Sequence, residues 1–452
     1  MNPYNQTQKV PVRTTSNAGQ SVQGMIRLLA FFYGLLVVYG SLYPFSGWSA
    51  PAQPLFYFLA APIPDHLSRA DILTNVLAYI PLGTLLVGSF RARWAVFSVV
   101  MATFAGTMLS FTMESVQMFL PARTSSNIDL LTNVIGTLAG AIIGLALRKE
   151  TLFSVNWRRR REEWFETGVA SDLALFSIVV WVASQLCPFV PSMDVSSIRE
   201  GLSPVKATLL TPGSFLALKC ASYGLNFTGL GLLAMVVARR GVRPAFLALA
   251  GSILLLKPLI VTRQLSLESL CGLGLAAILL AIAPQKRSAQ TLLAMFCVLS
   301  GFVVSELYSL AGGGLHPFNW IPLAGQLDDT VSGLGSILDT IWPFMALASL
   351  AILGFGRKRG AALSFGAIFL SLAFILEWVQ TGIEGRYGDI TTVLLAGAGW
   401  FLPWLYFFLA QPQPERISSA ARHRSHRHSR ASATDGNPRR VESQPAGIRD
   451  SI

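Results

Sequence analysis

The sequence has few charged residues, few cysteines and very few histidines, and each shortage narrows what the chain can be. Charged residues make up 13% of its 452 residues, about half their usual share in soluble domains. Hydrophobic residues make up 52%, and the mean hydropathy is +0.52. These values exclude an ordinary soluble domain and predict a polytopic membrane protein.

The scarcity of metal-binding side chains speaks against a metal or haem centre. The four cysteines have no C-x-x-C spacing and read as small buried hydrophobic residues; they are Cys187, Cys220, Cys271 and Cys297. Outside the C-terminal tail the only histidines are His66 and His316, which form no H-x-x-x-H pair. The sequence also has no nucleotide-binding loop, so we expect neither a metal nor a cofactor.

Apolar stretches recur along the chain at the length that a membrane-spanning helix requires, about 20 residues. We therefore expect an all-α integral membrane protein with about twelve transmembrane helices. The predicted spans are 25–43, 71–90, 94–113, 128–147, 172–190, 220–238, 244–262, 266–283, 291–310, 336–355, 361–380 and 389–409. The first 24 residues are polar and lack the apolar core of a signal peptide, so we expect the first span to be retained.

Basic residues occur in every second connection between these spans. They are Arg91, Arg93, Arg148, Lys149, the run 158–161, Arg239, Arg240, Arg243, Lys286, Arg287, Arg357, Lys358 and Arg359. By the positive-inside rule these connections and both termini lie in the cytoplasm. This placement explains the net charge of +12 better than a nucleic-acid partner does. We expect a multi-pass protein of the inner (cytoplasmic) membrane.

The predicted spans fall into three units of four, at 25–150, 172–285 and 291–410. They are flanked by a polar cytoplasmic N-terminus, 1–24, and a tail, 411–452. The tail is rich in Pro, Ser, Arg and His and poor in apolar residues, so we expect it to be disordered.

Polar residues near the third and fourth spans match between the first and third units. The matching pairs are Glu114 and Glu377, Gln117 and Gln380, Arg123 and Arg386, and Asp129 and Asp389. In the second unit the corresponding positions are degenerate, and the nearest residues are Asn226, Lys257, Arg263 and Glu268. Internal similarity of this length suggests duplication.

Two spans of the first unit begin with the same pattern, Asp71-x-x-x-Asn75 and Asp129-x-x-x-Asn133. Residues four positions apart share one face of a helix. An aspartate near the bilayer core costs about 2.5–3.5 kcal/mol on insertion scales, and such residues usually face a protein interior or a wet cavity. The repetition predicts a polar site between these two helices.

Further polar residues lie close to that site in the sequence. Glu114 and Gln117 come near the end of the third span, and Arg123 follows in a turn before Ser125, Ser126 or Asn127 caps the next helix. An arginine beside a helix N-terminus is suited to phosphate or carboxylate. We expect the carboxylates of Glu114, Asp71 and Asp129 to hold Arg123 when the site is empty, or to exchange protons with a ligand. The predicted ligand-binding residues are Asp71, Asn75, Glu114, Gln117, Arg123, Asp129 and Asn133, with a secondary candidate site at Glu377, Gln380, Arg386 and Asp389.

These residues resemble the VanZ-like family, a four-span membrane domain named for an accessory protein in teicoplanin resistance. The motifs are Ser41-Leu42-Tyr43-Pro44-Phe45, Asp71-x-x-x-Asn75 followed by Pro81-Leu82-Gly83, Glu114-x-x-Gln117, Arg123, and Asp129-x-x-x-Asn133-x-x-Gly136. The resemblance covers 25–147, and 291–410 in part. It implies an integral membrane protein of the bacterial envelope, connected in some members with glycopeptide tolerance or with cell-surface polymer production.

Three functions stay open at this point. The first is binding or transport of an anionic lipid-linked or glycan intermediate at an extracytoplasmic-side polar site, with membrane lipids as further partners. The second is a structural or scaffold protein whose polar cluster only joins helices. The third is a membrane-embedded hydrolase or transferase with Glu114 as general base, although no nucleophile–base pair supports an enzyme. The sequence does not specify the oligomeric state.

Overall fold

The computed structural model describes residues 14–51, 53–62, 69–90, 94–147, 152–192, 194–307, 314–328, 330–356 and 358–410. Within these ranges the chain is helical and has no β-strand, only isolated bridges such as that between Phe165 and Ala238. The expected all-α fold is confirmed. The tail at 411–452, the first 13 residues, His66 and the basic residues at 91, 93, 148, 149 and 357 lie outside the described residues.

Ten helices in the described part of the chain are long and apolar enough to cross a membrane. They are α1 (Thr14–Leu42), α3 (Arg69–Ser89), α4 (Ala95–Gln117), α5 (Asn127–Ala146), α7 (Val169–Leu186), α9 (Ala217–Val237), α12 (Arg287–Leu307), α14 (Thr330–Phe355), α15 (Arg359–Gln380) and α16 (Ile390–Ala410). Shorter helices are α2 (Tyr57–Ala60), α6 (Leu152–Trp164), α8 (Val195–Leu210), α10 (Arg243–Leu256), α11 (Leu267–Ala281) and α13 (Ala324–Asp328), with single 3₁₀ turns η1 (Pro212–Ser214) and η2 (Lys257–Leu259).

The seventh and eighth predicted spans are shorter than the sequence suggests. Helix α10 has 14 residues and α11 has 15, so each is about 21–23 Å long, whereas the hydrocarbon core is about 30 Å thick. Lys257 and Pro258 form the 3₁₀ turn that follows α10, because Pro258 cannot donate a helical hydrogen bond. The predicted count of twelve is confirmed for ten helices and stays a prediction for these two.

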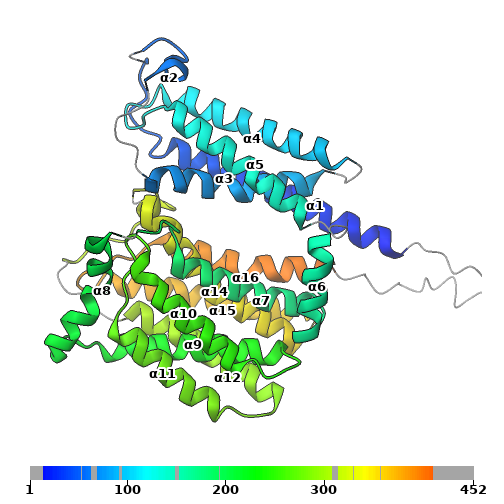
Figure 1. Ribbon diagram of the computed structural model, residues 1–452, viewed down its shortest axis with the longest axis vertical. Helices are drawn as coiled ribbons and strands as arrows, with labels where there is room; N and C mark the ends of the chain where they lie inside the picture. Colours follow the sequence, from blue (N-terminus) through cyan, green and yellow to red (C-terminus); the bar gives the residue numbers. More distant parts are fainter. Residues whose placement is uncertain are drawn as a thin grey trace, which may run out of the picture. The chain divides into compact units, whose positions relative to one another are not determined.

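Taken in chain order, the helices labelled in Figure 1 divide into three groups of four whose members make the same contacts. In chain order, the first group is α1, α3, α4 and α5, the second is α7, α9, α10 and α11, and the third is α12, α14, α15 and α16. In each group the second helix packs against the fourth, and the third also contacts the fourth. The short helices α2, α8 and α13 follow the first helix of each group.

The second and third groups also interlock. Helix α7 of the second group packs on α14 of the third, and α12 of the third packs on α9 of the second. As a result, 67% of the α9 span and 61% of the α14 span are buried, against 22% of the α3 span in the first group. The main apolar core, including Trp181, Phe227 and Phe344, therefore lies between the second and third groups.

Close packing in the first group depends on glycines of α5. A Cβ atom added at Gly136 would lie 2.4 Å from the Val76 carbonyl oxygen, and one at Gly140 would lie 2.0 Å from that of Ile80. No larger residue fits at either contact. Small residues that let two backbones approach are the usual basis of helix association in membranes.

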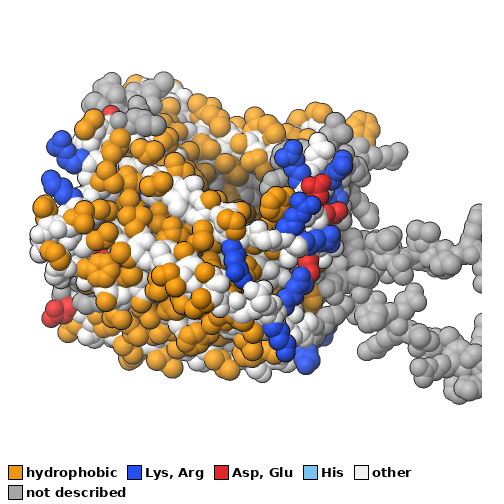
Figure 2. Space-filling model, turned by 60° about the horizontal axis from the view of Figure 1, so that its bottom comes forward, with side chains coloured by type: hydrophobic (Ala, Val, Ile, Leu, Met, Phe, Trp, Pro, Cys, Tyr) orange, Lys and Arg blue, Asp and Glu red, His pale blue; other side chains and the backbone are white. Residues whose placement is uncertain are grey.

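Basic side chains gather in a band along one side of the face shown in Figure 2. Contacts among the described residues bring three of the predicted basic connections together. Arg161 of α6 pairs with Asp172 at 2.6 Å, Arg287 at the start of α12 pairs with Glu166, and the Arg240 guanidinium lies over the Trp164 ring. These connections therefore share one end of the helix groups.

Candidate functional site

In the first group, two of the predicted ligand-binding residues bind the end of α1. The Gln117 amide donates to the Ser41 carbonyl at 2.8 Å. The Arg123 guanidinium donates from Nε to the Tyr43 carbonyl at 2.8 Å and from Nη2 to that of Gly40 at 3.2 Å. The last carbonyls of a helix have no partner within the helix, so these side chains stabilise the end of α1 and join it to α4.

The expected contact between Arg123 and carboxylates is absent. Among the described residues, no Asp or Glu oxygen lies within 4.0 Å of the Arg123 guanidinium, so this part of the prediction is wrong. The end of α1 carries the negative pole of the helix dipole, and its carbonyls take the place that we assigned to Glu114, Asp71 and Asp129.

Glu114 lies at the junction of α4 and α5. Its side chain is buried, and Oε2 accepts a hydrogen bond from the Ser126 backbone N–H at 2.9 Å. Ser126 is the N-cap of α5, because its Oγ accepts from the Ile128 N–H at 3.1 Å. Ser125 donates to the Glu114 carbonyl at 2.6 Å. The predicted cap is therefore confirmed, and the carboxylate binds an N–H group at the positive end of a helix.

The asparagines of the two Asp-x-x-x-Asn motifs make contacts between different pairs of helices. Asn75 of α3 donates to Asp129 of α5 at 2.7 Å, whereas Asn133 of α5 donates to Ser110 of α4 at 3.0 Å. Asp71 is exposed in the first turn of α3. The polar residues of this group thus lie along the contacts between its helices.

This arrangement occurs in the part of the chain that matches a known family. Residues 11–148 match the model of the VanZ/LLP1 family. The first group is VanZ-like. The comparisons with curated proteins and with solved structures give no match. The partial resemblance of 291–410 lies outside the matched segment and stays a prediction.

The arginine contact of the VanZ-like group recurs in the other two groups. Arg263 donates to the carbonyls of Cys187 and Ser184 at the end of α7, and Arg386 donates to that of Ser305 near the end of α12. In each group, therefore, an arginine between the third and fourth helices holds the end of the first helix.

The glutamate contact recurs in the third group and corrects one predicted correspondence. Glu377 accepts from the Asp389 N–H at 2.7 Å, as Glu114 does from Ser126. Asp389 Oδ1 in turn accepts from the Thr391 N–H at 2.8 Å, which is a helix-capping contact. Asp389 therefore corresponds to Ser126 and not, as the sequence spacing suggested, to Asp129.

A cavity of about 570 Å³ lies between the second and third groups. All four residues of the secondary candidate site, Glu377, Gln380, Arg386 and Asp389, line this cavity. None of the seven predicted residues of the VanZ-like group does so. The remaining charged lining residues are Lys219, Lys257, Arg263, Glu306 and Asp339.

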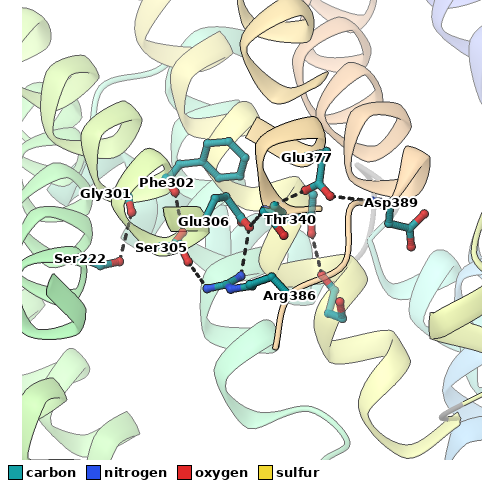
Figure 3. Close-up of polar contacts among 11 residues, drawn as sticks. Ser222, Gly301, Phe302, Ser305, Glu306, Thr340, Glu377, Arg386 and Asp389 are labelled. Carbon is teal, nitrogen blue, oxygen red and sulfur yellow. Dashed lines mark hydrogen bonds and ion pairs between the residues drawn. The ribbon is translucent and has the colours of Figure 1, made fainter. Parts of the chain in front are cut away.

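Polar contacts run along the third-group wall of the cavity (Figure 3). Arg386 pairs with Glu306 of α12 at 3.4 Å, and Gln380 donates to the same carboxylate at 2.8 Å. Gln380 also lies 3.5 Å from Glu377, whose other oxygen accepts from Asp389. Arg386, Glu306 and Glu377 thus form a connected wall that joins α12 to α15 and α16.

Lys257 is the cavity residue that the sequence-based site lacked. It is 6% exposed, and its Nζ lies 5.7 Å from the centre of the Tyr223 ring. Among the described residues no hydrogen-bond acceptor binds this ammonium and no carboxylate lies within 4.0 Å. The signal in the sequence is a lysine inside the apolar run 252–261. Among the described residues there is also no cluster of three or more His, Cys, Asp or Glu that could hold a metal.

Proposed function

We propose that the chain binds an anionic lipid-linked or glycan intermediate of the bacterial envelope in the cavity between the second and third groups. The observation that carries this proposal is Lys257, a buried ammonium on the cavity wall for which the described part of the chain supplies no acceptor. An ionisable residue in a membrane protein marks a functional site by default. A phosphate or carboxylate would supply the partner that Lys257 lacks.

The free-energy cost of an unpaired buried charge supports this reading. Removing an ion from water costs several kcal/mol unless a partner compensates for it. The cation–π contact with Tyr223 supplies about 0.5–2 kcal/mol, which is less than that cost. Arg263 and Lys219 line the same cavity and would add positive potential around a bound anion.

The position of the cavity along the helices supports an extracytoplasmic-side site. Lys257 follows the end of α10, whose first residue is Arg243. Arg386 follows the end of α15, whose first residue is Arg359. If the basic ends face the cytoplasm by the positive-inside rule, the cavity opens toward the other side, where envelope intermediates are used. This placement fits binding, or a binding step of transport.

We also infer that the three groups are diverged copies of one unit, at 25–150, 172–285 and 291–410. The shared packing of second on fourth helix and the three arginine contacts support this inference. The VanZ-like copy keeps the most family motifs, whereas the other two copies enclose the cavity. In this view the ligand site and the best-matched copy are separate.

The contacts within the VanZ-like group favour a second role for its residues. Arg123, Gln117 and Glu114 all bind backbone groups at helix ends, as expected for side chains that hold a scaffold together. Ligand binding at Arg123 and general-base catalysis by Glu114 remain alternative predictions, and the Arg123→Ala variant in the binding experiment below tests the first of them.

Binding of polyprenyl phosphate to the purified full-length protein tests the proposal. We expect saturable binding to the wild type and a loss of about a hundredfold or more in Lys257→Met, because removing one member of a buried charge pair costs about 3–5 kcal/mol. Lys206→Met, at an exposed position of α8, is the matched control. Arg386→Ala and Arg123→Ala show whether the ligand binds in the cavity or in the VanZ-like group. Equal binding in all variants, or loss only in a folded Arg123→Ala, would contradict the proposed cavity.

A further inference from the structure

The walls of the cavity between the second and third groups carry opposite charges. The second group supplies cations, Lys219 near the start of α9, Lys257 after α10 and Arg263 in the following turn. The third group supplies mainly carboxylates, Glu306 of α12, Asp339 of α14, Glu377 of α15 and Asp389 before α16, together with a cation, Arg386. A ligand in this cavity therefore meets both signs of charge.

Most of these charges already have partners within the protein. Glu306 binds Arg386 and Gln380, and Lys219 lies 3.9 Å from Glu268. Arg263 binds two carbonyls at the end of α7. These groups therefore have partners without a ligand, although the two carbonyls leave the positive charge of Arg263 uncompensated.

Two opposite charges stand apart from that network. Among the described residues Lys257 has no acceptor, and Asp339 has a single hydrogen bond, from the Gln185 amide at 3.1 Å. Asp339 lines the same cavity as Lys257, yet their charged atoms do not approach within the 4.0 Å of an ion pair. They come from different groups, α10 with η2 on one side and α14 on the other.

We infer that the cavity takes a zwitterionic headgroup, a phosphate joined to a primary amine, which bridges Lys257 and Asp339. This inference rests on the proposed anion binding at Lys257 and names the ligand class of that site. The phosphate pairs with Lys257, and the ammonium pairs with Asp339. A ligand with only negative charge, such as polyprenyl phosphate, can still pair with Lys257 but leaves the Asp339 carboxylate beside a second anion, so it should bind more weakly than the zwitterion.

The other lining residues suit such a headgroup. Trp181, Tyr223 and Trp342 line the same cavity, and aromatic faces attract ligand ammonium groups. The volume of about 570 Å³ falls within the range of about 300–1,000 Å³ typical of small-molecule sites. It accommodates a headgroup with its phosphate, while acyl or prenyl chains remain in the bilayer.

Native mass spectrometry of the full-length protein with short-chain phosphatidylethanolamine and phosphatidylglycerol tests the inference. These lipids share the phosphate and differ in the amine. We expect the wild type to bind phosphatidylethanolamine at least about tenfold more tightly, because a charge-assisted hydrogen bond contributes about 1.5–3 kcal/mol. N-acetylation of the ethanolamine, which removes its positive charge, should abolish the preference.

Asp339→Asn should bind both lipids alike, whereas Asp194→Asn, a carboxylate-to-amide change outside the cavity, should keep the preference. If Asp339→Asn does not fold, the N-acetylated lipid still decides the question with wild-type protein. Equal or tighter binding of phosphatidylglycerol by the wild type would overturn the zwitterion inference. If Lys257→Met then loses this binding, the proposed anion binding at Lys257 still holds. Binding of both lipids that does not depend on Lys257 would overturn the proposed function as well.

Discussion

Replacing Arg123 by alanine should destabilise the VanZ-like group by removing two contacts that hold α1. The guanidinium binds the carbonyls of Tyr43 and Gly40 at 2.8 and 3.2 Å. Polar contacts between helices in membrane proteins contribute about 0.6 kcal/mol on average and up to about 1.7 kcal/mol. Two contacts therefore predict a loss of about 1–3 kcal/mol in the free energy of unfolding.

The measurement is unfolding of the purified protein in mixed micelles with increasing SDS, followed by tryptophan fluorescence. Arg160→Ala, an exposed arginine of α6, is the control and should leave the unfolding free energy unchanged. Arg123→Lys should recover only part of the loss, because one ammonium cannot reproduce the two-pronged geometry of a guanidinium. An Arg123→Ala protein of wild-type stability that fails to bind polyprenyl phosphate would refute the reasoning and assign Arg123 to the ligand.

Two further predictions concern α5. Gly140→Leu should prevent the normal packing of α3 on α5, because even a Cβ would lie 2.0 Å from the Ile80 carbonyl oxygen; we expect loss of folded protein in size-exclusion chromatography, whereas the same change at Gly34, which has open space around it, should be tolerated. Ser126→Ala should cost about 0.5–2 kcal/mol by removing the N-cap. Faster amide hydrogen exchange at Ile128, with no change in the middle of α5, would show the effect, and unchanged exchange would contradict it.

The sequence predicts a membrane-spanning helix correctly where a long apolar stretch lies between two polar connections. Ten of the twelve expected spans are long helices, because about 20 apolar residues between polar connections leave few alternatives in a membrane. The prediction was less accurate around Lys257 and Pro258, which end α10 early. There the apolar residues after Pro258 extended the hydrophobic pattern, although the backbone leaves the helix.

The residues of the candidate site could be predicted in part from the sequence, but the helices that surround the site could not. Residue spacing identified Glu377, Gln380 and Arg386, which line the cavity. Residue spacing could not show that α7 packs on α14 and α12 on α9. Helical periodicity identifies the apolar face of a helix but not the helix that packs against it. For the same reason the sequence could not show that Lys257 lines one cavity with residues of the third group.

The same spacing argument gave the wrong partner for Arg123. An arginine near three carboxylates suggests ion pairs, whereas the unpaired carbonyls at the end of α1 were not visible as a pattern of side chains. Backbone groups at helix ends are strong acceptors. Sequence comparisons that consider only side chains miss them.

The interlocking of the second and third groups has a consequence for biosynthesis. Helix α7 leaves the ribosome well before its partner α14 is made, and at about 5–20 residues per second the delay lasts roughly 7–30 seconds. During that time Ser177, which is fully buried in the finished protein and lies against Ser349 of α14, has no α14 to cover it. The nascent chain must therefore be held by lipid, by the insertion machinery or by α9 until the third group arrives, and premature termination before α14 would leave a product for quality-control proteases to remove.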